Sequence, residues 1–286
     1  MYQDLRQERV AIFEETRRLC QTDQRLADAI ERAKQRQKMI AEGEPLSVPD
    51  TLYDTPAEVI VSQKRSLAAA EAYTGKKICV MNFASATNAG GGVEKGASAQ
   101  EEGICRCSTL YPCISDKQIV SRFHYAHRSA LHHGRLSVLY NDDCIYTPGV
   151  IVFRSDTRHP QLLPKERWYE IDVVSCAAPN LRSKPGNAMN PDAGSKPVTI
   201  GKDELRKLHK KRIGRIMDIA GCFGVQVMIV GAFGCGAFQN PPEAVAEAMR
   251  EVITEHRYRF QTIEAAVYCP VQDTTNYDVF KKIVSL

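Results

Sequence analysis

Three consecutive glycines followed by two acidic residues are the part of the sequence whose residue types and spacing best suit chemistry. The glycines occupy positions 90–92, soon after an apolar run at 78–83, and Glu101 and Glu102 follow them. Because glycine has no Cβ, the backbone N–H groups of such a loop can come close to a phosphate. Open α/β sheets bind ligands at the carboxyl ends of their strands, where this loop is expected. The segment therefore predicts an anion-binding loop beside two carboxylates, although a lone GGG is more often a flexible surface loop.

The two glutamates are expected to differ in role. Ser98 and Glu101 have the spacing of a capping box, in which Ser98 caps a helix and Glu101 bonds back to its amide. Successive residues of a helix point about 100° apart, so Glu101 and Glu102 cannot flank one bond as the paired carboxylates of many glycosidases do. If the loop performs glycoside chemistry, we expect Glu102 alone to act as both acid and base.

A second glycine-rich loop follows a later apolar run and contains Gly231, Gly234 and Gly236. A helix is predicted after it, with Asn240 as the N-cap and Pro241 as the first helical residue. A loop of this kind presents backbone N–H groups to a diphosphate at the amino end of a helix. Neither loop has the G-x-G-x-x-G pattern of dinucleotide-binding enzymes or the Gly-Lys-Ser/Thr of a Walker loop.

Short apolar runs alternate with helical patterns from residue 50 onward. Near-continuous apolar strands separated by helices are typical of a sheet that is covered on both faces. The runs that predict strands are 59–62, 78–83, 137–141, 150–153, 171–178, 225–233 and 265–269, and the predicted helices lie near 64–73, 99–108, 116–131, 203–221, 242–255 and 274–285. We therefore expect an α/β fold with three layers, α/β/α, around a mixed sheet.

The first part of the chain has a different character. Residues 3–42 predict two helices rich in Arg, Glu and Gln, and 43–50 contain the glycine and prolines that end them. This break divides the chain into an N-terminal helical extension, 1–45, and a core domain, 46–286. The extension could pack on the domain, which its thin apolar stripe favours, or it could bind a partner.

The composition is that of an ordinary globular protein. The 286 residues are 43% hydrophobic and 25% charged, and the formal net charge is +4. No apolar run is long enough to span a bilayer, and the first residues lack the apolar core of a signal peptide. Ten cysteines without a CxxC pair suit a reducing compartment, so we expect a cytoplasmic protein without membrane contact. The mild charge gives no basic stripe for duplex nucleic acid.

Several polar groups are expected to be structural. The basic stretch 205–215 predicts the solvated side of an amphipathic helix. Asp142, Asp143 and the histidines are expected to be surface or capping groups. Buried thiols on a helix explain the local cysteine group better than a metal site does; its members are Cys105, Cys107 and Cys113.

The first loop resembles the signature of poly(ADP-ribose) glycohydrolases, in which QEE follows GGG after seven further residues. Here GGG stands at 90–92 and QEE at 100–102. The segment NFASATNAGGGVEKGASAQEE, followed by CRCSTLYPC, is similar to the microbial branch of the family, which has a macrodomain core without the large accessory domain of the animal enzymes. Ala89 departs from the Asn-Pro-Gly-Gly-Gly of microbial relatives, which is expected to loosen the loop without removing a ligand contact. The resemblance extends from about residue 51 to the end of the chain.

The resemblance implies cleavage of the ribose–ribose O-glycosidic bond of poly(ADP-ribose), with release of ADP-ribose and without a metal or cofactor. Glu102 would protonate the departing ribose oxygen and then deprotonate water, while Glu101 and Asn88 orient the ribose. Phe238 matches the aromatic that family members pack against the terminal ribose, although a core aromatic has the same pattern. The implied ADP-ribose-binding residues are Asn88, Gly90, Gly91, Gly92, Val93, Gln100, Gly231, Ala232, Phe233, Gly234, Cys235, Gly236, Ala237 and Phe238.

Other functions stay open at this point. The chain could bind ADP-ribose without turnover, or it could remove mono-ADP-ribose from protein or nucleic acid. It could also bind NAD as a dehydrogenase, for which the strand-linked G-x-G-x-x-G is missing. The intact QEE argues against a pure reader of ADP-ribose. Endo and exo action on the polymer are both compatible with the sequence.

Overall fold

A sheet of seven strands is the centre of the computed structural model, which describes residues 2–285. The strand order is β1-β4-β5-β3-β6-β7-β2, in which β5, β3, β6, β7 and β2 run parallel while β4 and β1 are antiparallel to their neighbours. The strands are β1 (Lys38–Ile40), β2 (Glu58–Ser62), β3 (Ile78–Phe83), β4 (Cys144–Val152), β5 (Tyr169–Cys176), β6 (Val227–Val230) and β7 (Thr262–Ala266).

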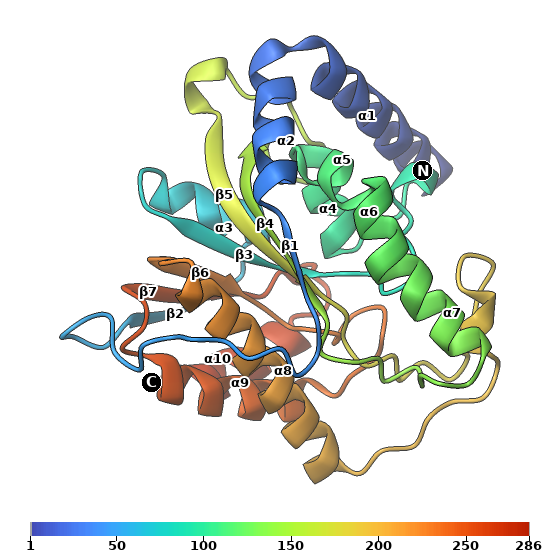
Figure 1. Cartoon of the computed structure of the whole chain (residues 1–286), viewed down its shortest axis with the longest axis vertical. Coiled ribbons are helices and arrows are strands. Elements are labelled where there is room, and N and C mark those ends of the chain that lie inside the picture. Colours follow the sequence, from blue (N-terminus) through green and yellow to red (C-terminus); the bar gives the residue numbers. More distant parts are fainter. Residues whose placement is uncertain (1, 286) are drawn as a thin grey trace.

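Helices cover both faces of the sheet, which confirms the predicted three-layer α/β/α fold (Figure 1). One face carries α8 (Lys202–Cys222), α9 (Pro242–His256) and α10 (Thr275–Val284). Helices packed on the other face include α1 (Tyr2–Thr22), α2 (Gln24–Arg36), α3 (Ser66–Ala70), α4 (Gln100–Cys107) and α5 (Leu110–Ile114). The short α6 (Lys117–Ile119), a π-helical turn (Val120–Tyr125) and α7 (Ala126–His132) follow one another beside them.

Alternation along β3 shows how the sheet separates two cores. Ile78 and Val80 pack among the helices of one face, whereas Cys79 and Met81 pack among those of the other, and all four are buried. This is the two-residue period of a strand that is covered on both sides. The predicted strand at 78–83 matches β3 for that reason.

Two strand predictions near β4 were wrong or incomplete. Residues 137–141 form a turn, in which the Tyr140 amide donates to the Ser137 carbonyl, and contain no strand. The strand predicted at 150–153 is the second half of β4. Its first half holds Pro148 and Gly149, and the pairing register with β5 shifts there, so the apolar pattern is interrupted.

The two N-terminal helices pack on the sheet and share its core. Phe13 of α1 and Leu26 of α2 are buried in the same apolar cluster as β3. The Thr16 hydroxyl donates to the Arg106 carbonyl of α4 and accepts from Arg154, at 2.7 and 3.0 Å. After α2, residues 38–40 form the edge strand β1, although the sequence predicted helix there. The division of the chain at residue 45 stays a prediction.

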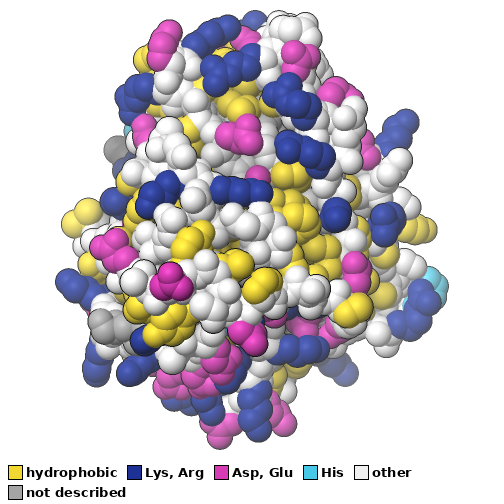
Figure 2. Space-filling model, turned by 60° about the vertical axis from the view of Figure 1, so that its left-hand side comes forward, with side chains coloured by type: hydrophobic (Ala, Val, Ile, Leu, Met, Phe, Trp, Pro, Cys, Tyr) yellow, Lys and Arg dark blue, Asp and Glu magenta, His cyan; other side chains and the backbone are white. Residues whose placement is uncertain are grey.

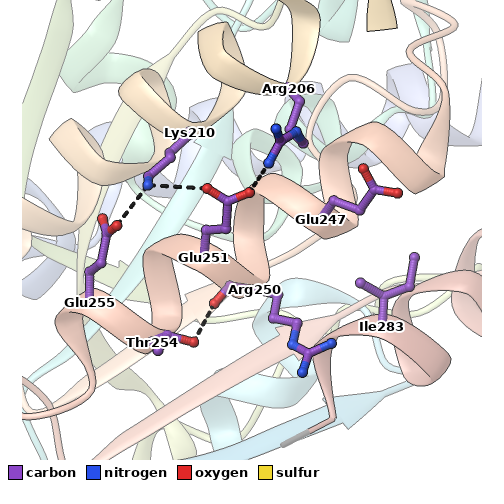
Figure 3. A pocket seen from close by; sticks show the side chains of 8 residues that line it. All are labelled: Arg206, Lys210, Glu247, Arg250, Glu251, Thr254, Glu255 and Ile283. Atoms are coloured by element: carbon purple, nitrogen blue, oxygen red, sulfur yellow. Dashed lines mark hydrogen bonds and ion pairs between the residues drawn. The ribbon is translucent and has the colours of Figure 1, made fainter. Parts of the chain in front are cut away.

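Helix α8 is more buried than the sequence indicated. His209 and Arg212 lie in the basic stretch predicted to be solvated, yet both side chains are almost completely enclosed. The exposed side of α8 makes ion pairs with α9 instead. Lys210 contacts Glu251 and Glu255 at 3.1 and 2.7 Å, as Figure 3 shows.

Charged side chains of both signs are mixed over the surface. Figure 2 shows dark blue and magenta side chains between one another on one face, with magenta ones gathered toward the bottom. None of the helices in the described chain is long and apolar enough to cross a membrane.

Candidate active site

The two glycine loops meet because their strands are neighbours. The first loop follows β3 and the second follows β6, and these strands are paired in parallel at the middle of the sheet. Parallel strands bring their carboxyl ends to the same edge, where α/β sheets bind ligands. Phe83, at the end of β3, contacts Phe233 of the second loop with 5.6 Å between ring centroids. The sheet therefore places the two loops side by side.

Gln100 fixes the start of α4 to the end of β3. Its side-chain amide donates to the Met81 carbonyl at 2.7 Å and to the Ser66 hydroxyl at 3.0 Å. Its oxygen accepts from the Phe83 amide at 2.9 Å. All of these partners belong to the protein, so the structure gives Gln100 a positioning role. Its predicted ligand contact stays a prediction.

Glu101 is buried beneath the loop that follows β3. Its Oε2 accepts from the Ser85 amide at 2.8 Å, and its Oε1 accepts from Asn82 at 3.4 Å. The predicted capping box is wrong, because Ala99 is the N-cap of α4 and no side chain caps it. Burial and the neighbouring charge of Glu102 raise the pKa of Glu101 to about 8, against the lowering effect of these hydrogen bonds.

Glu102 is held through one oxygen only. Its Oε1 accepts from the Gly92 amide at 2.9 Å. Its Oε2 is buried and has no hydrogen-bond partner within the described part of the chain. A buried carboxylate oxygen without a partner is costly, and such groups in native structures call for a functional explanation. Glu102 therefore has one carboxylate oxygen that no other group in the described part of the chain binds.

Gly91 makes room for both carboxylates. A Cβ at this position would lie 2.6 Å from Glu102 Oε1 and 3.2 Å from Glu101 Oε2, and the residue has a φ of +57°. Only glycine adopts this conformation without strain, and only glycine leaves the space open. Although they project from successive helical residues, the two carboxylates thus border the same space under the loop.

The amides of the first loop bind the protein's own acceptors. Gly92 donates to Glu102, Gly91 donates to the Asn88 carbonyl at 3.0 Å, and Val93 donates to the Gly90 carbonyl at 3.1 Å. The sequence predicted that this loop would offer its amides to a phosphate. In the structure the Gly92 amide binds the Glu102 carboxylate, so the loop places this glutamate. The predicted contact of the loop with ADP-ribose stays a prediction.

Asn88 lies at the border between the first loop and the segment after β5. Its side-chain nitrogen donates to the Met189 carbonyl at 2.8 Å, and its oxygen accepts from Arg128 at 3.0 Å. The side chain is half-buried. Its predicted ribose contact stays a prediction.

The second loop has backbone donors to spare. Among the hydrogen bonds of the described residues, none is donated by the amides of Gly234, Gly236 or Ala237. The Asn240 side chain braces the loop by donating to the carbonyls of Gly234 and Pro179, at 3.1 and 2.7 Å. The loop therefore has the free amides that a diphosphate needs.

The helix after this loop starts later than predicted. It begins at Pro242 with Pro241 at the N-cap position, so Asn240 is not the cap. Asn240 is instead buried inside the loop, where its oxygen contacts His209 Nε2 at 2.9 Å. Pro242 occupies the first helical position, where its missing N–H removes one of the donors that the start of a helix leaves unpaired.

Two aromatic residues of the second loop have different surroundings. Phe233 is fully buried between Phe83 and His209, so its side chain belongs to the core. Phe238 is only partly buried, and its ring centroid lies 6.2 Å from that of Tyr140. Of the two, Phe238 is the aromatic that a ligand can reach.

Metal ligands are not gathered at the site. Within the described residues there is no group of three or more His, Cys, Asp or Glu side chains that could hold a metal ion. The three clustered cysteines of the sequence are all buried. They lie on α4 and α5, as the helical explanation expects.

Comparison with known proteins agrees with this geometry. The family model of the microbial-type poly(ADP-ribose) glycohydrolase (PARG) catalytic domain matches residues 6–155, a span that contains both glutamates. The chain belongs to this family. The match begins at residue 6, well before residue 51, so the resemblance includes most of the helical segment that we expected to precede it.

Solved poly(ADP-ribose) glycohydrolases share the whole fold. The enzyme from Thermomonospora curvata is 28% identical, with a TM-score of 0.80 over 97% of this chain and 99% of that one. Its complex with the inhibitor ADP-HPD gives 27% identity and a TM-score of 0.76 over the same shares of the two chains. The Deinococcus radiodurans enzyme in complex with ADP-ribose is 24% identical, with a TM-score of 0.69 over 89% and 96% of the chains, and shows likeness of fold. No curated protein sequence matches the chain.

Some residues around the site were not found from the sequence. Asp142 was expected at the surface, but it is buried against Arg212, and Tyr140 was assigned to a strand. Asn82 had a detectable signal, because a buried asparagine inside an apolar strand needs partners. It donates to Glu101 and to the Ser175 hydroxyl.

Gly91→Ala is expected to lower turnover of poly(ADP-ribose) by about 100-fold, because the new methyl group displaces Glu102 and a small misplacement of a catalytic group has an effect of that order. Gly103→Ala on α4 is the matched control, since its Cβ would meet nothing closer than Asp156 at 3.8 Å. Released ADP-ribose measured by chromatography checks both variants. Equal turnover in the two would show that the space under Gly91 is unimportant.

The raised pKa of Glu101 predicts a pH-dependent stability. A carboxyl whose folded pKa exceeds its ordinary value of 4.5 contributes stability that is full below 4.5 and is lost as the pH rises through about 8. The free energy of unfolding of the wild type, minus that of Glu101→Gln, should therefore fall between these two pH values. Denaturant titrations across this range measure it. A difference that stays constant or rises would contradict the burial of an ionisable carboxyl here.

Proposed function

We propose that Glu102 is the general acid and base that cleaves the ribose–ribose O-glycosidic bond of poly(ADP-ribose). The observation that supports this role is its asymmetric binding: one carboxylate oxygen is held by the Gly92 amide and the other is buried without a partner. A general acid must lie within hydrogen-bond reach of the atom that it protonates, and its free oxygen can provide that contact.

The reaction uses Glu102 twice. In its protonated form Glu102 gives the proton to the departing ribose oxygen while the C–O bond breaks through a transition state of oxocarbenium character. The resulting carboxylate then removes a proton from the water that attacks the sugar carbon. Glu102 is protonated again at the end, and the products are ADP-ribose and a polymer shortened by one unit.

Glu101 supports this chemistry as a mostly uncharged group. Burial and the charge of Glu102 raise its pKa to about 8, so it retains its proton more readily while Glu102 is a carboxylate. A protonated carboxyl can donate a hydrogen bond to a ribose hydroxyl, which a carboxylate cannot. We assign Glu101 and Asn88 to orientation of the ribose.

The ADP portion is assigned to the second loop. The free amides of Gly234, Gly236 and Ala237 suit the diphosphate, and Phe238 suits the terminal ribose. The Thermomonospora enzyme binds ADP-HPD and the Deinococcus enzyme binds ADP-ribose, which supports the same class of ligand for this chain.

The substrate is poly(ADP-ribose) or an ADP-ribosylated macromolecule. The cytoplasmic location and the absence of contact with membranes or duplex nucleic acid stay predictions from the sequence.

Glu102→Gln is expected to keep its affinity for ADP-ribose and to lower turnover by about 100-fold or more, as loss of a general acid and base does. Glu94→Gln is the control, because Glu94 lies on the same loop, is exposed and pairs with Tyr111 away from Glu102. Chromatography of the products of automodified polymer measures turnover, and calorimetry measures binding. Normal turnover in Glu102→Gln would remove this residue from its role, and wild-type binding without release of ADP-ribose would indicate a reader.

A further inference from the structure

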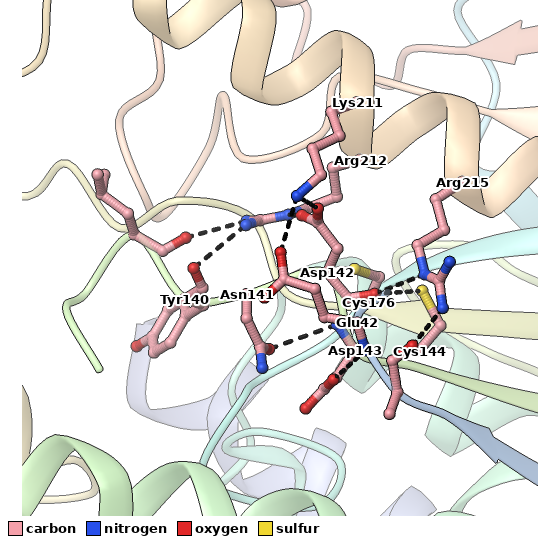
Figure 4. Close-up of polar contacts among 12 residues, drawn as sticks. Glu42, Tyr140, Asn141, Asp142, Asp143, Cys144, Cys176, Lys211, Arg212 and Arg215 are labelled. Carbon is pink, nitrogen blue, oxygen red and sulfur yellow. Dashed lines mark hydrogen bonds and ion pairs between the residues drawn. The ribbon is translucent and has the colours of Figure 1, made fainter. Parts of the chain in front are cut away.

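Arg212 is the largest of the fully buried side chains and lies on α8, on the side that faces the sheet. Its Nε donates to Asp142 Oδ1 at 2.8 Å. Its Nη1 donates to the carbonyls of Leu139 and Ala177, at 3.0 and 2.8 Å, and its Nη2 donates to that of Tyr140 at 3.3 Å. Figure 4 shows this guanidinium between the loop before β4 and the end of β5.

The pair of Arg212 and Asp142 is a charged one. Burial raises the pKa of Asp142, but Arg212 and Lys211 outweigh that effect and hold it below its ordinary value. Lys211 reaches Asp142 Oδ2 from the solvent side at 2.7 Å. The charge of the aspartate balances that of the arginine, which permits the guanidinium to be buried and to use its remaining donors on backbone carbonyls.

The loop before β4, whose carbonyls Arg212 binds, contains a residue in a strained backbone conformation. Tyr140 has a φ of 55°, a left-handed conformation that is unfavourable for a large aromatic residue. Such conformations persist only where surrounding contacts impose them, and they gather at ligand sites. Arg212 binds the carbonyls of Leu139 and of Tyr140 itself, so it is one of the contacts that hold this conformation, together with the bond from the Tyr140 amide to the Ser137 carbonyl.

Tyr140 in turn borders the second glycine loop. Its ring lies against Phe238, and its hydroxyl accepts from Asn190 at 3.2 Å. Arg212 also binds the carbonyl of Ala177. The next residue, Ala178, lies so close to the second loop that a Cβ added to Gly234 would be 2.8 Å from the Cβ of Ala178. One guanidinium thus fixes two of the surfaces against which the second loop is packed.

We propose that Arg212 is a positioning residue for ADP-ribose binding, which holds Tyr140 and the end of β5 so that Phe238 and the amides of the second loop are preorganised for the ligand. The inference rests on the proposed function of that loop. It assigns no contact between Arg212 and the substrate, so its effect is on affinity, whereas Glu102 controls the chemical step.

Arg212→Lys tests the inference, because lysine keeps the charge beside Asp142 but has no planar fork, and its three donors are too few for Asp142 and the three carbonyls together. We expect the Kd for ADP-ribose and the KM for polymer to rise by about tenfold while kcat changes less than about threefold, as loss of preorganisation predicts. Calorimetry and steady-state kinetics measure these constants.

Arg215→Lys is the matched control on the same helix. Arg215 donates to the carbonyls of Asp142, Glu44 and Ala41, and it contacts neither Tyr140 nor Ala177. Its substitution should lower the melting temperature while leaving the Kd within about twofold of the wild type, which is the range of ordinary surface effects on binding. Equal changes of Kd in the two lysine variants would reduce Arg212 to a general stabilising residue and overturn the proposal.

Tyr140→Asn provides a second test, which does not require a change of the buried arginine. Asparagine tolerates a positive φ, so the backbone is preserved while the ring is lost. We expect its Kd to rise as in Arg212→Lys, and Tyr140→Phe to bind at least about fivefold more tightly than Tyr140→Asn because it restores the ring against Phe238. A Tyr140→Asn variant that binds as the wild type does would overturn the inference, even if Arg212→Lys does not fold. Wild-type protein that binds no ADP-ribose would instead overturn the proposed function.

Discussion

The hydrogen bond from the Gly92 amide to Glu102 Oε1 is the contact on which the site depends. It joins the loop after β3 to the helix that carries both glutamates, and it leaves the second oxygen of Glu102 unpartnered. The same arrangement requires glycine at position 91, because a Cβ there would occupy the space that the two carboxylates border. Gln100 completes it by tying the first turn of α4 to the last residues of β3. The unpartnered oxygen of Glu102 thus results from the way that the loop closes on the helix.

A second constraint comes from the sheet. Because β3 and β6 are adjacent and parallel, the loop that holds the glutamates and the loop with free amides lie at one edge. The division of labour between them follows from their hydrogen bonds. The amides of the first loop donate to acceptors of the protein itself, whereas amides of the second loop have no such acceptor among the described residues and can bind an external anion. The ion pair of Arg212 and Asp142 lies beside the second loop. Arg212 binds the carbonyls of Tyr140 and of Ala177 at the end of β5, which pack against that loop.

The sequence predicts the parts of this arrangement that depend on local patterns. Continuous apolar runs located β3, β6 and β7 to within a few residues, and the spacing of GGG and QEE identified the family. It did not predict contacts between distant segments. The helical period places Arg212 on the apolar side of α8 and Lys211 on the exposed side, but it does not show that the guanidinium is enclosed, because that depends on the loop before β4. The capping box at Ser98 and Glu101 failed for the same reason, since tertiary contacts with Ser85 and Asn82 replaced the local bond.

The most direct test of the account is a crystal structure of the chain with ADP-ribose bound. It should show a hydroxyl of the terminal ribose within about 3 Å of Glu102 Oε2, the distance that a general acid requires, and the diphosphate on the amides of Gly234, Gly236 and Ala237. A complex with the diphosphate on the loop at 90–92, or with the terminal ribose turned away from Glu102, would contradict it.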